Sequence, residues 1–219
     1  MAAKCEFEVE VFSSETGQWT DSVLSSPKPI YWSTPLTNAI VYNGLLHWLT
    51  RGNEILVYDI YSSRVVLLID KPEGIPDPWL QLHCLGLCRG SLHICVVYRM
   101  NLLIWQLQDC NKWSLKCQVN LTLQHSILHG RQWLNPSYWF SGRVIAIHPY
   151  DPNILYIGLS MSTHRVLSCN LATKTSKLVM VFSFPSNYGY FYQSEDVFTL
   201  MLPWWLYAHA SMVAVGRGA

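Results

Sequence analysis

The stretch from residue 43 to residue 69 constrains the fold most, because it contains three short apolar strands separated by polar turns. The pair Asn43-Gly44, a strong tight-turn signal, precedes the first strand, residues 45–50. The other two strands, residues 55–60 and 65–69, are rich in β-branched and aromatic side chains. All three are mostly apolar on both faces, whereas a sheet with one face in water would alternate. The stretch therefore predicts a sheet stacked between other sheets.

The same order of signals returns further along the chain. Gly44 and Gly90 each end a turn and are followed by an apolar strand with a histidine three residues on; they are 90 − 44 = 46 residues apart. A third copy is predicted to start near Gly142, at 142 − 90 = 52 residues. Periods of about 40–50 residues with about four strands each are typical of propeller blades. The sequence thus predicts an all-β fold, a partial or small β-propeller of about four blades of four-stranded antiparallel sheets.

The length of 219 residues needs only one domain, which we place over residues 1–219. A connecting loop is predicted at residues 25–29, which hold two prolines, and Trp19 and Trp113 are predicted to pack between blades. We expect a half blade over residues 5–22, blades over about 39–69, 82–119 and 144–182, and closing strands over about 191–215.

Three motifs in this order resemble a known family. Residues 43–49 read NGLLHWL and residues 55–60 read ILVYDI, similar to the NG-x-L-[HY]-W-L and I-L-x-[FY]-D strands of the plant F-box-associated β-propeller domain, a kelch-like propeller. Residues 11–19, VFSSETGQW, resemble the same family's first motif. The resemblance runs from about Cys5 to about Trp205. It implies a propeller that sits behind an F-box and captures the protein to be ubiquitinated by an SCF-type ubiquitin ligase.

Composition and charge exclude several classes of protein. Half of the residues are hydrophobic and only 13% are charged, so disorder is not expected. The formal net charge of +1, with scattered basic residues, offers no electrostatic case for nucleic acid. The seven cysteines are odd in number and follow no recognisable secretory signal, which favours a reduced cytoplasmic or nuclear setting.

Residues 197–215 are the one candidate for a membrane span, because they carry no Asp, Glu, Lys or Arg. Pro203 interrupts them near the middle, and Trp204 and Trp205 stand beside it instead of at an interface. We therefore interpret this segment as closing strands, with a membrane anchor as the alternative.

No motif for catalysis or for a cofactor occurs, so we expect no enzyme, no cofactor and no metal. Cys84, Cys88 and Cys95 lie near His83 and His93, but no second short-range pair completes a zinc pattern, and an apolar strand favours a core role for its cysteines. His47 and His93 occupy equivalent positions of the repeat. This equivalence predicts a structural slot in which the ring nitrogens bond to backbone.

Protein recognition is the predicted function, because loops on rigid scaffolds carry function and Trp and Tyr dominate binding hot spots. The candidate partner-binding aromatics lie in predicted connections: Tyr31, Trp32, Trp79, Trp133, Tyr138, Trp139, Tyr188 and Tyr190. No Leu-Pro-containing F-box helix stands before the first strand, so only the substrate-binding half of the resemblance carries over, and direct binding of the ligase adaptor is not expected. The alternative is a truncated or membrane-anchored paralogue without ligase function.

Overall fold

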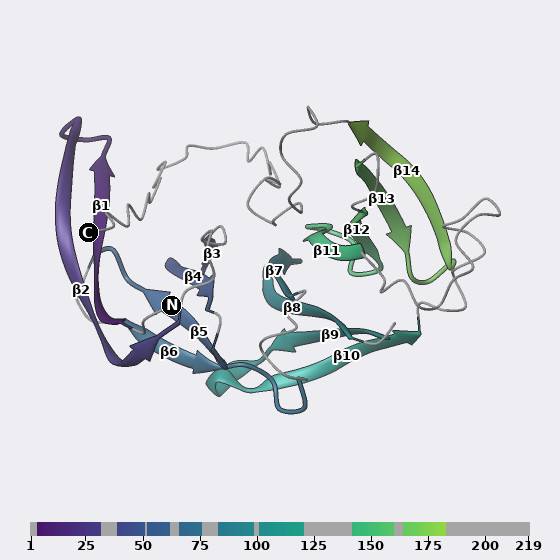
Figure 1. Cartoon of the computed structure of the whole chain (residues 1–219), viewed down its shortest axis with the longest axis horizontal. Helices are drawn as coiled ribbons and strands as arrows, with labels where there is room; N and C mark the ends of the chain where they lie inside the picture. The colour runs from purple at the N-terminus through teal and green to yellow at the C-terminus, as the bar shows by residue number, and fades with distance from the viewer. Residues whose placement is uncertain are drawn as a thin grey trace. The chain divides into compact units, whose positions relative to one another are not determined.

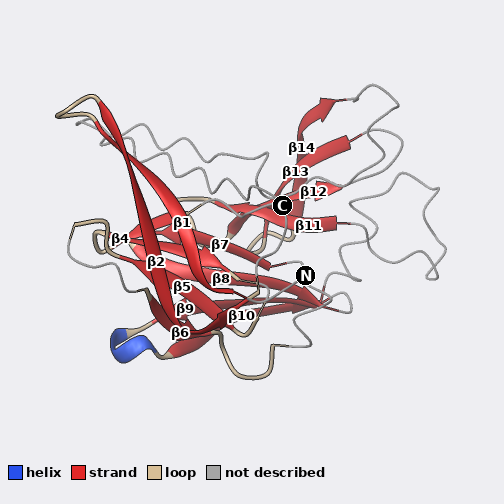
Figure 2. Cartoon of the chain, turned by 60° about the vertical axis from the view of Figure 1, so that its left-hand side comes forward, coloured by secondary structure: helices blue, strands red, loops and turns tan. Residues whose placement is uncertain are grey.

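A computed structural model describes residues 4–31, 39–50, 52–61, 66–75, 83–98, 101–120, 142–159 and 164–182. Most of these residues form β-strands, and the helical structure among them is one 3-10 turn, Asp109–Asn111 (Figure 2). None of them belongs to a helix that could cross a membrane, and residues 197–215 lie outside the described part. The prediction of an all-β fold is confirmed.

The chain divides into two compact units, which we treat in turn: Met1–Asp70 with Leu200–Ala219, and Lys71–Thr199. The first unit holds a two-stranded ribbon and a four-stranded antiparallel sheet (Figure 1). The ribbon consists of β1 (Lys4–Ser13) and β2 (Gln18–Ile30). The sheet has the order β3 (Ile40–Tyr42), β4 (Leu45–Leu49), β5 (Glu54–Tyr58), β6 (Leu67–Asp70).

Strand β2 runs through the segment predicted as a connecting loop, so that prediction is wrong. Ser25 pairs with Glu6, and after an irregularity in register Ile30 pairs with Lys4. Pro27 and Pro29 are exposed, and prolines are tolerated in a strand whose outer edge has no ladder to complete. The burial of Ser26 and Ile30 on one face keeps the strand pattern across both prolines.

The core of the first unit lies between the ribbon and the sheet. Val9, Leu24 and Ile30 of the ribbon belong to one buried cluster with Trp48 of β4 and Tyr58 of β5. Four consecutive residues of β4 and of β5 are buried, which includes both faces of each strand. The prediction that these strands are covered on both sides is therefore confirmed.

The second unit holds two four-stranded antiparallel sheets. One has the order β7 (His83–Cys88), β8 (Ser91–Tyr98), β9 (Asn101–Leu107), β10 (Trp113–Asn120). The other has the order β11 (Gly142–Ile147), β12 (Ile154–Leu159), β13 (His164–Asn170), β14 (Thr175–Phe182). The three four-stranded sheets start and end within two residues of the predicted blades. The prediction of one domain over residues 1–219 stays a prediction.

The predicted position of the third copy of the repeat is wrong by one strand. The Asn43-Gly44 and Arg89-Gly90 turns, with positive φ at both residues of each pair, join the first strand of a sheet to its second. Gly142 instead begins the first strand of its sheet. The turn that corresponds to these two in the third sheet joins β11 to β12 and lies at residues 148–153. It comes later in the sequence than the repeat period predicts, because residues 121–141 separate β10 from β11. The 52-residue spacing is thus not a true period.

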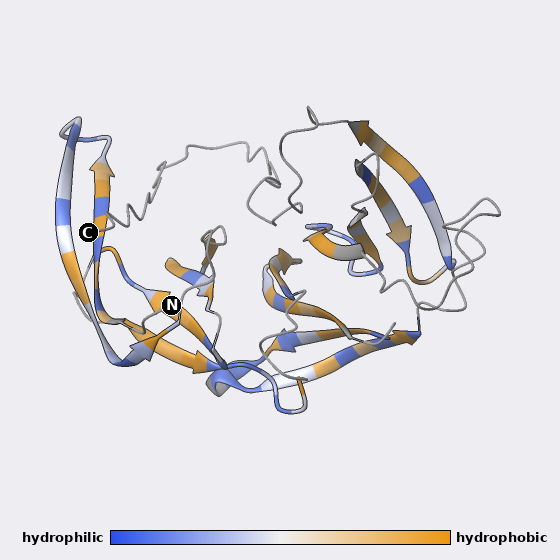
Figure 3. Cartoon of the chain, viewed as in Figure 1, coloured by the Kyte–Doolittle hydropathy of each residue, from blue (hydrophilic) through white to orange (hydrophobic). Residues whose placement is uncertain are grey.

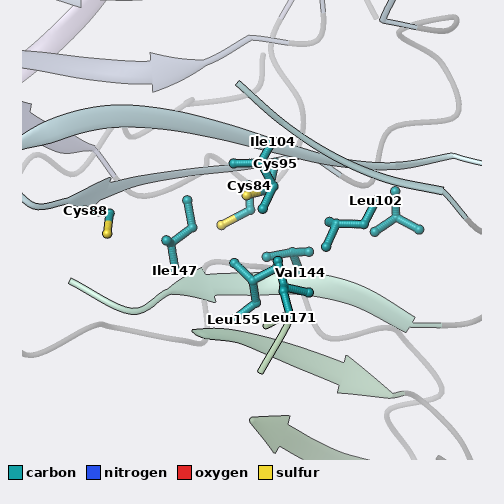
Figure 4. Packing of buried hydrophobic residues seen from close by; sticks show 10 residues of the cluster. Cys84, Cys88, Cys95, Leu102, Ile104, Val144, Ile147, Leu155 and Leu171 are labelled. Carbon is teal, nitrogen blue, oxygen red and sulfur yellow. The ribbon is translucent and has the colours of Figure 1, made fainter. Parts of the chain in front are cut away.

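The buried cysteines belong to the core of the second unit, as predicted. Cys84, Cys88 and Cys95 form one apolar cluster with Val144 of β11 and Leu155 of β12, and Figure 4 shows all five. Burial raises the pKa of the Cys95 thiol well above its usual value, with neighbouring thiols adding to the effect. The Cys95 thiol therefore stays neutral, and the three cysteines pack as small apolar side chains.

Trp19 does not pack between blades, so that prediction is wrong. Its side chain is 53% exposed, and its ring lies beside Phe12 with 5.2 Å between centroids. Trp113, placed in the same class, is half-buried at the start of β10. The sequence signal for the turn before Trp19 is local, whereas the burial of Trp19 depends on which face of the ribbon packs against the core.

Gly86 of β7 provides a stability prediction for the second unit. A Cβ atom at this position would lie 3.1 Å from Cδ1 of Ile147 in β11, tighter than ordinary contact. Gly86→Val is expected to lower the free energy of unfolding by about 1–3 kcal/mol through overpacking. The cost should shrink when Ile147→Ala is added, as urea titrations of the single and double variants would show. Additive costs would mean that the two positions do not meet.

Candidate functional site

Only one of the eight predicted partner-binding aromatics lies in the described residues. Tyr31 follows β2 directly and is 45% exposed, as a contact residue requires. The other seven lie outside the described residues: Trp32, Trp79, Trp133, Tyr138, Trp139, Tyr188 and Tyr190. Their role stays a prediction.

The turn between β11 and β12, which we call the Tyr150 turn (residues 148–153), is held by its own side chains. His148 Nδ1 accepts hydrogen bonds from the backbone N–H groups of Tyr150 (3.2 Å) and Asp151 (3.1 Å). The Asp151 carboxylate accepts one from the Asn153 N–H at 2.9 Å. Side chains that bond to nearby backbone in this way replace a sheet ladder where the chain reverses. The backbone around Tyr150 is therefore satisfied without any partner.

A second turn anchors the Tyr150 turn from the neighbouring sheet. Arg89, between β7 and β8, donates its backbone N–H to the Pro149 carbonyl (2.7 Å) and its Nε–H to the Tyr150 carbonyl (2.9 Å). Arg89 has a φ of 50°, a left-handed conformation that the Arg89-Gly90 turn requires. Two hydrogen bonds between residues far apart in the sequence, one of them 61 residues apart, thus join the ends of two sheets at one place.

The side chain of Tyr150 projects from this fixed backbone. It is 68% exposed, and its ring meets His148 edge-on with 6.2 Å between centroids. His148 also stacks over Tyr156 of β12 at 6.4 Å. An exposed tyrosine on a rigid backbone loses little conformational entropy on binding, which suits a hot spot. Tyr150 is not among the aromatics predicted from the sequence, although the prolines on both sides of the Tyr150-Asp151 pair are a local signal for this turn.

His47 and His93 have the structural role predicted for them. Nδ1 of His47 donates to the Leu45 carbonyl at 3.1 Å, and Nδ1 of His93 donates to the Ser91 carbonyl at 3.0 Å. Burial lowers the pKa of both rings, against the smaller opposite effect of these backbone bonds. The matching position of the third sheet, the third residue of β12, holds Tyr156.

Within the part of the chain that the structure describes, no three His, Cys, Asp or Glu side chains gather as a metal site would need. The expectations of no metal, no cofactor and no enzyme activity stay predictions. What the described geometry offers is a surface for contact, centred on the Tyr150 turn.

Comparison with known proteins decides the family. Residues 2–203 match the model of the F-box protein At3g26010-like β-propeller family. The chain belongs to this family. The match covers all four described sheets and agrees with the propeller predicted from the repeat and with the resemblance found in the motifs. No curated protein matches the chain.

One solved structure with a similar arrangement is a structural-genomics protein from Lactobacillus plantarum. It is 14% identical, with a TM-score of 0.41, over 80% of this chain and 50% of that one. The chain thus spans about half the length of that protein. The assignment to the propeller family rests on the family match.

Proposed function

We propose that this β-propeller recognises a protein, and that it does so as the substrate-capturing part of an SCF-type ubiquitin ligase. Family membership supports the proposal, because the family is that of F-box protein propellers. The observation that carries it is the Tyr150 turn, where an exposed aromatic stands on a backbone fixed by hydrogen bonds from two sheets. The partner of the propeller is a protein, and the propeller acts in the cytoplasm or nucleus.

The test captures partners with the purified chain in the presence and absence of the ligase adaptor. We expect the same proteins to be retained in both cases, because recognition belongs to the propeller. Ubiquitination of a retained protein should require the ligase and this chain together. If no retained protein changes its ubiquitination when the chain is removed from cells, ligase substrate capture is wrong.

Tyr150→Ala is expected to weaken partner retention at least about tenfold, as truncation of an aromatic hot spot does. Stability should change by less than about 1 kcal/mol, since the side chain is mostly in water. Tyr61→Ala is the matched control, because Tyr61 is 82% exposed in a turn of the other unit. Quantitative mass spectrometry and thermal unfolding measure the two effects. Equal retention by both variants would exclude the Tyr150 turn as the contact.

A further inference from the structure

The ribbon of β1 and β2 has two chemically different faces. Its inner face carries Val9 and Leu24, buried in the core of the first unit. Every second residue of β1 points the other way, and this outer face consists of four cross-strand pairs, none with a buried member: Glu6 with Ser25, Glu8 with Val23, Glu10 with Asp21, and Phe12 with Trp19. Figure 3 shows the resulting alternation of hydropathy along β1.

The outer face is strongly acidic. Residues 5–27 contain five acidic residues and no Lys or Arg, in a chain whose formal net charge is +1. Glu10 and Asp21 stand directly opposite each other, an arrangement that destabilises an antiparallel pair. Among the described residues, no basic side chain forms an ion pair with the four carboxylates of the face, whereas Glu54 and Asp70 of the same unit both lie within 4 Å of Lys28. Within the described residues this negative charge is therefore uncompensated.

Exposed apolar side chains lie on the same face as the carboxylates. Trp19 is 53% and Val23 51% exposed, and Phe12 packs against the Trp19 ring at the tip of the ribbon. A tryptophan face attracts the guanidinium of Arg or the ammonium of Lys, and Trp is the residue most enriched in binding hot spots. Carboxylates together with an exposed Trp fit a basic protein segment. They would repel the phosphates of a nucleic acid.

We infer that the outer face of the β1–β2 ribbon binds an extended basic segment of a partner protein, with Lys or Arg at every second residue. The spacing follows from the strand, since Glu6, Glu8 and Glu10 recur every two residues, about 7 Å apart. An extended partner has the same period, so its alternate cations meet successive carboxylates. The inference rests on the proposed function, which it deepens by stating the chemistry of the captured protein.

The test uses the full chain and a fluorescently labelled peptide of alternating Lys and Thr, with a Glu-Thr peptide of the same length as control. Fluorescence anisotropy should show binding of the Lys peptide only, weakening as salt rises from about 0.01 M to about 0.15 M, where the Debye length falls from about 30 Å to about 8 Å. Equal binding of both peptides, or no binding of either, would overturn the inference.

Paired variants locate the binding. Glu8→Gln with Glu10→Gln should weaken binding of the Lys peptide about tenfold, and Trp19→Ala a few-fold. Glu73→Gln with Asp109→Asn removes the same charge from exposed positions of the other unit and should change nothing. Removing the repulsion between Glu10 and Asp21 should leave the melting temperature equal or higher. Loss of binding with unchanged or increased stability therefore cannot come from misfolding, and unchanged binding would contradict the inference.

Two further measurements separate this inference from its alternatives. Sedimentation equilibrium should show a monomer; self-association that the Glu8/Glu10 variant abolishes would make a second copy the occupant and overturn the inference. Peptide binding without any captured ubiquitination substrate would refute the proposed function and leave the ribbon face standing. Substrate capture that the Glu8/Glu10 variant leaves intact, together with no peptide binding, would refute the ribbon face alone.

Discussion

Trp48→Ala is expected to lower the free energy of unfolding by about 3–5 kcal/mol. Trp48 lies in β4, is 9% exposed, and packs in one cluster with Val9 and Leu24 of the ribbon and Tyr58 of β5. The substitution leaves a large cavity between sheet and ribbon, which these neighbours cannot fill without leaving their own strands. Urea titration followed by circular dichroism measures the loss, which is a large fraction of the stability of a domain of this size.

Trp19→Ala is the matched control for this prediction. It removes the same atoms from a side chain that is 53% exposed and contacts only Phe12 among the aromatic rings of the described residues. Its cost should stay below about 1.5 kcal/mol, the contribution of one aromatic pair. Similar losses for the two variants would mean that the ribbon does not cover β4 with its inner face.

Acidification from pH 6.5 to pH 4.5 is expected to cost about 2 kcal/mol of stability through His83 alone. Burial, with a smaller effect from the positive charge of Lys71, lowers the pKa of His83 from 6.5 to about 3 in the folded chain. Below pH 6.5 the unfolded chain therefore binds a proton at this ring that the folded chain does not. Stability is lost as pH falls through this window, at a rate that approaches about 1.4 kcal/mol per pH unit at its lower end. Burial of His47 and His93 acts in the same direction.

A non-titrating variant isolates the contribution of His83. In His83→Phe the slope of unfolding free energy against pH should decrease between pH 6.5 and pH 4.5. The decrease should approach about 1.4 kcal/mol per pH unit, which corresponds to one bound proton. Comparison with the unmodified chain cancels the titration of the carboxylates, which occurs in both. Identical slopes would show that His83 is accessible to water in the folded chain and titrates near its usual value.

Much of the fold can be predicted from the sequence, because its signals are local. The Asn43-Gly44 and Arg89-Gly90 turns need left-handed backbone at both residues, and this alone places a hairpin between apolar segments. The repeated His47 and His93 indicated a shared structural slot, and the structure gives both the same hydrogen bond to a carbonyl two residues earlier. The strand boundaries followed from these turns.

Other predictions failed where the information is not local. Residues 25–29 look like a loop because of their prolines, but the edge of a two-stranded ribbon needs no further hydrogen bonds and accepts them. Gly142 resembles Gly44 and Gly90 in sequence but begins a different strand of its sheet. In each case a neighbour far along the chain decides what the local pattern becomes.

The two candidate contact surfaces also depend partly on the local sequence and partly on the tertiary structure. The alternation Glu6, Glu8, Glu10 stands in the sequence, and the sequence alone determines that these carboxylates share one face of a strand. Only the tertiary structure decides which face of the ribbon the core covers, and hence that Trp19 is exposed while Trp48 is buried. Likewise, only the packing of two sheets brings Arg89 to the carbonyls of Pro149 and Tyr150 and so fixes the Tyr150 turn. Turn geometry and alternation depend on neighbours in sequence, whereas burial and these hydrogen bonds depend on neighbours in space.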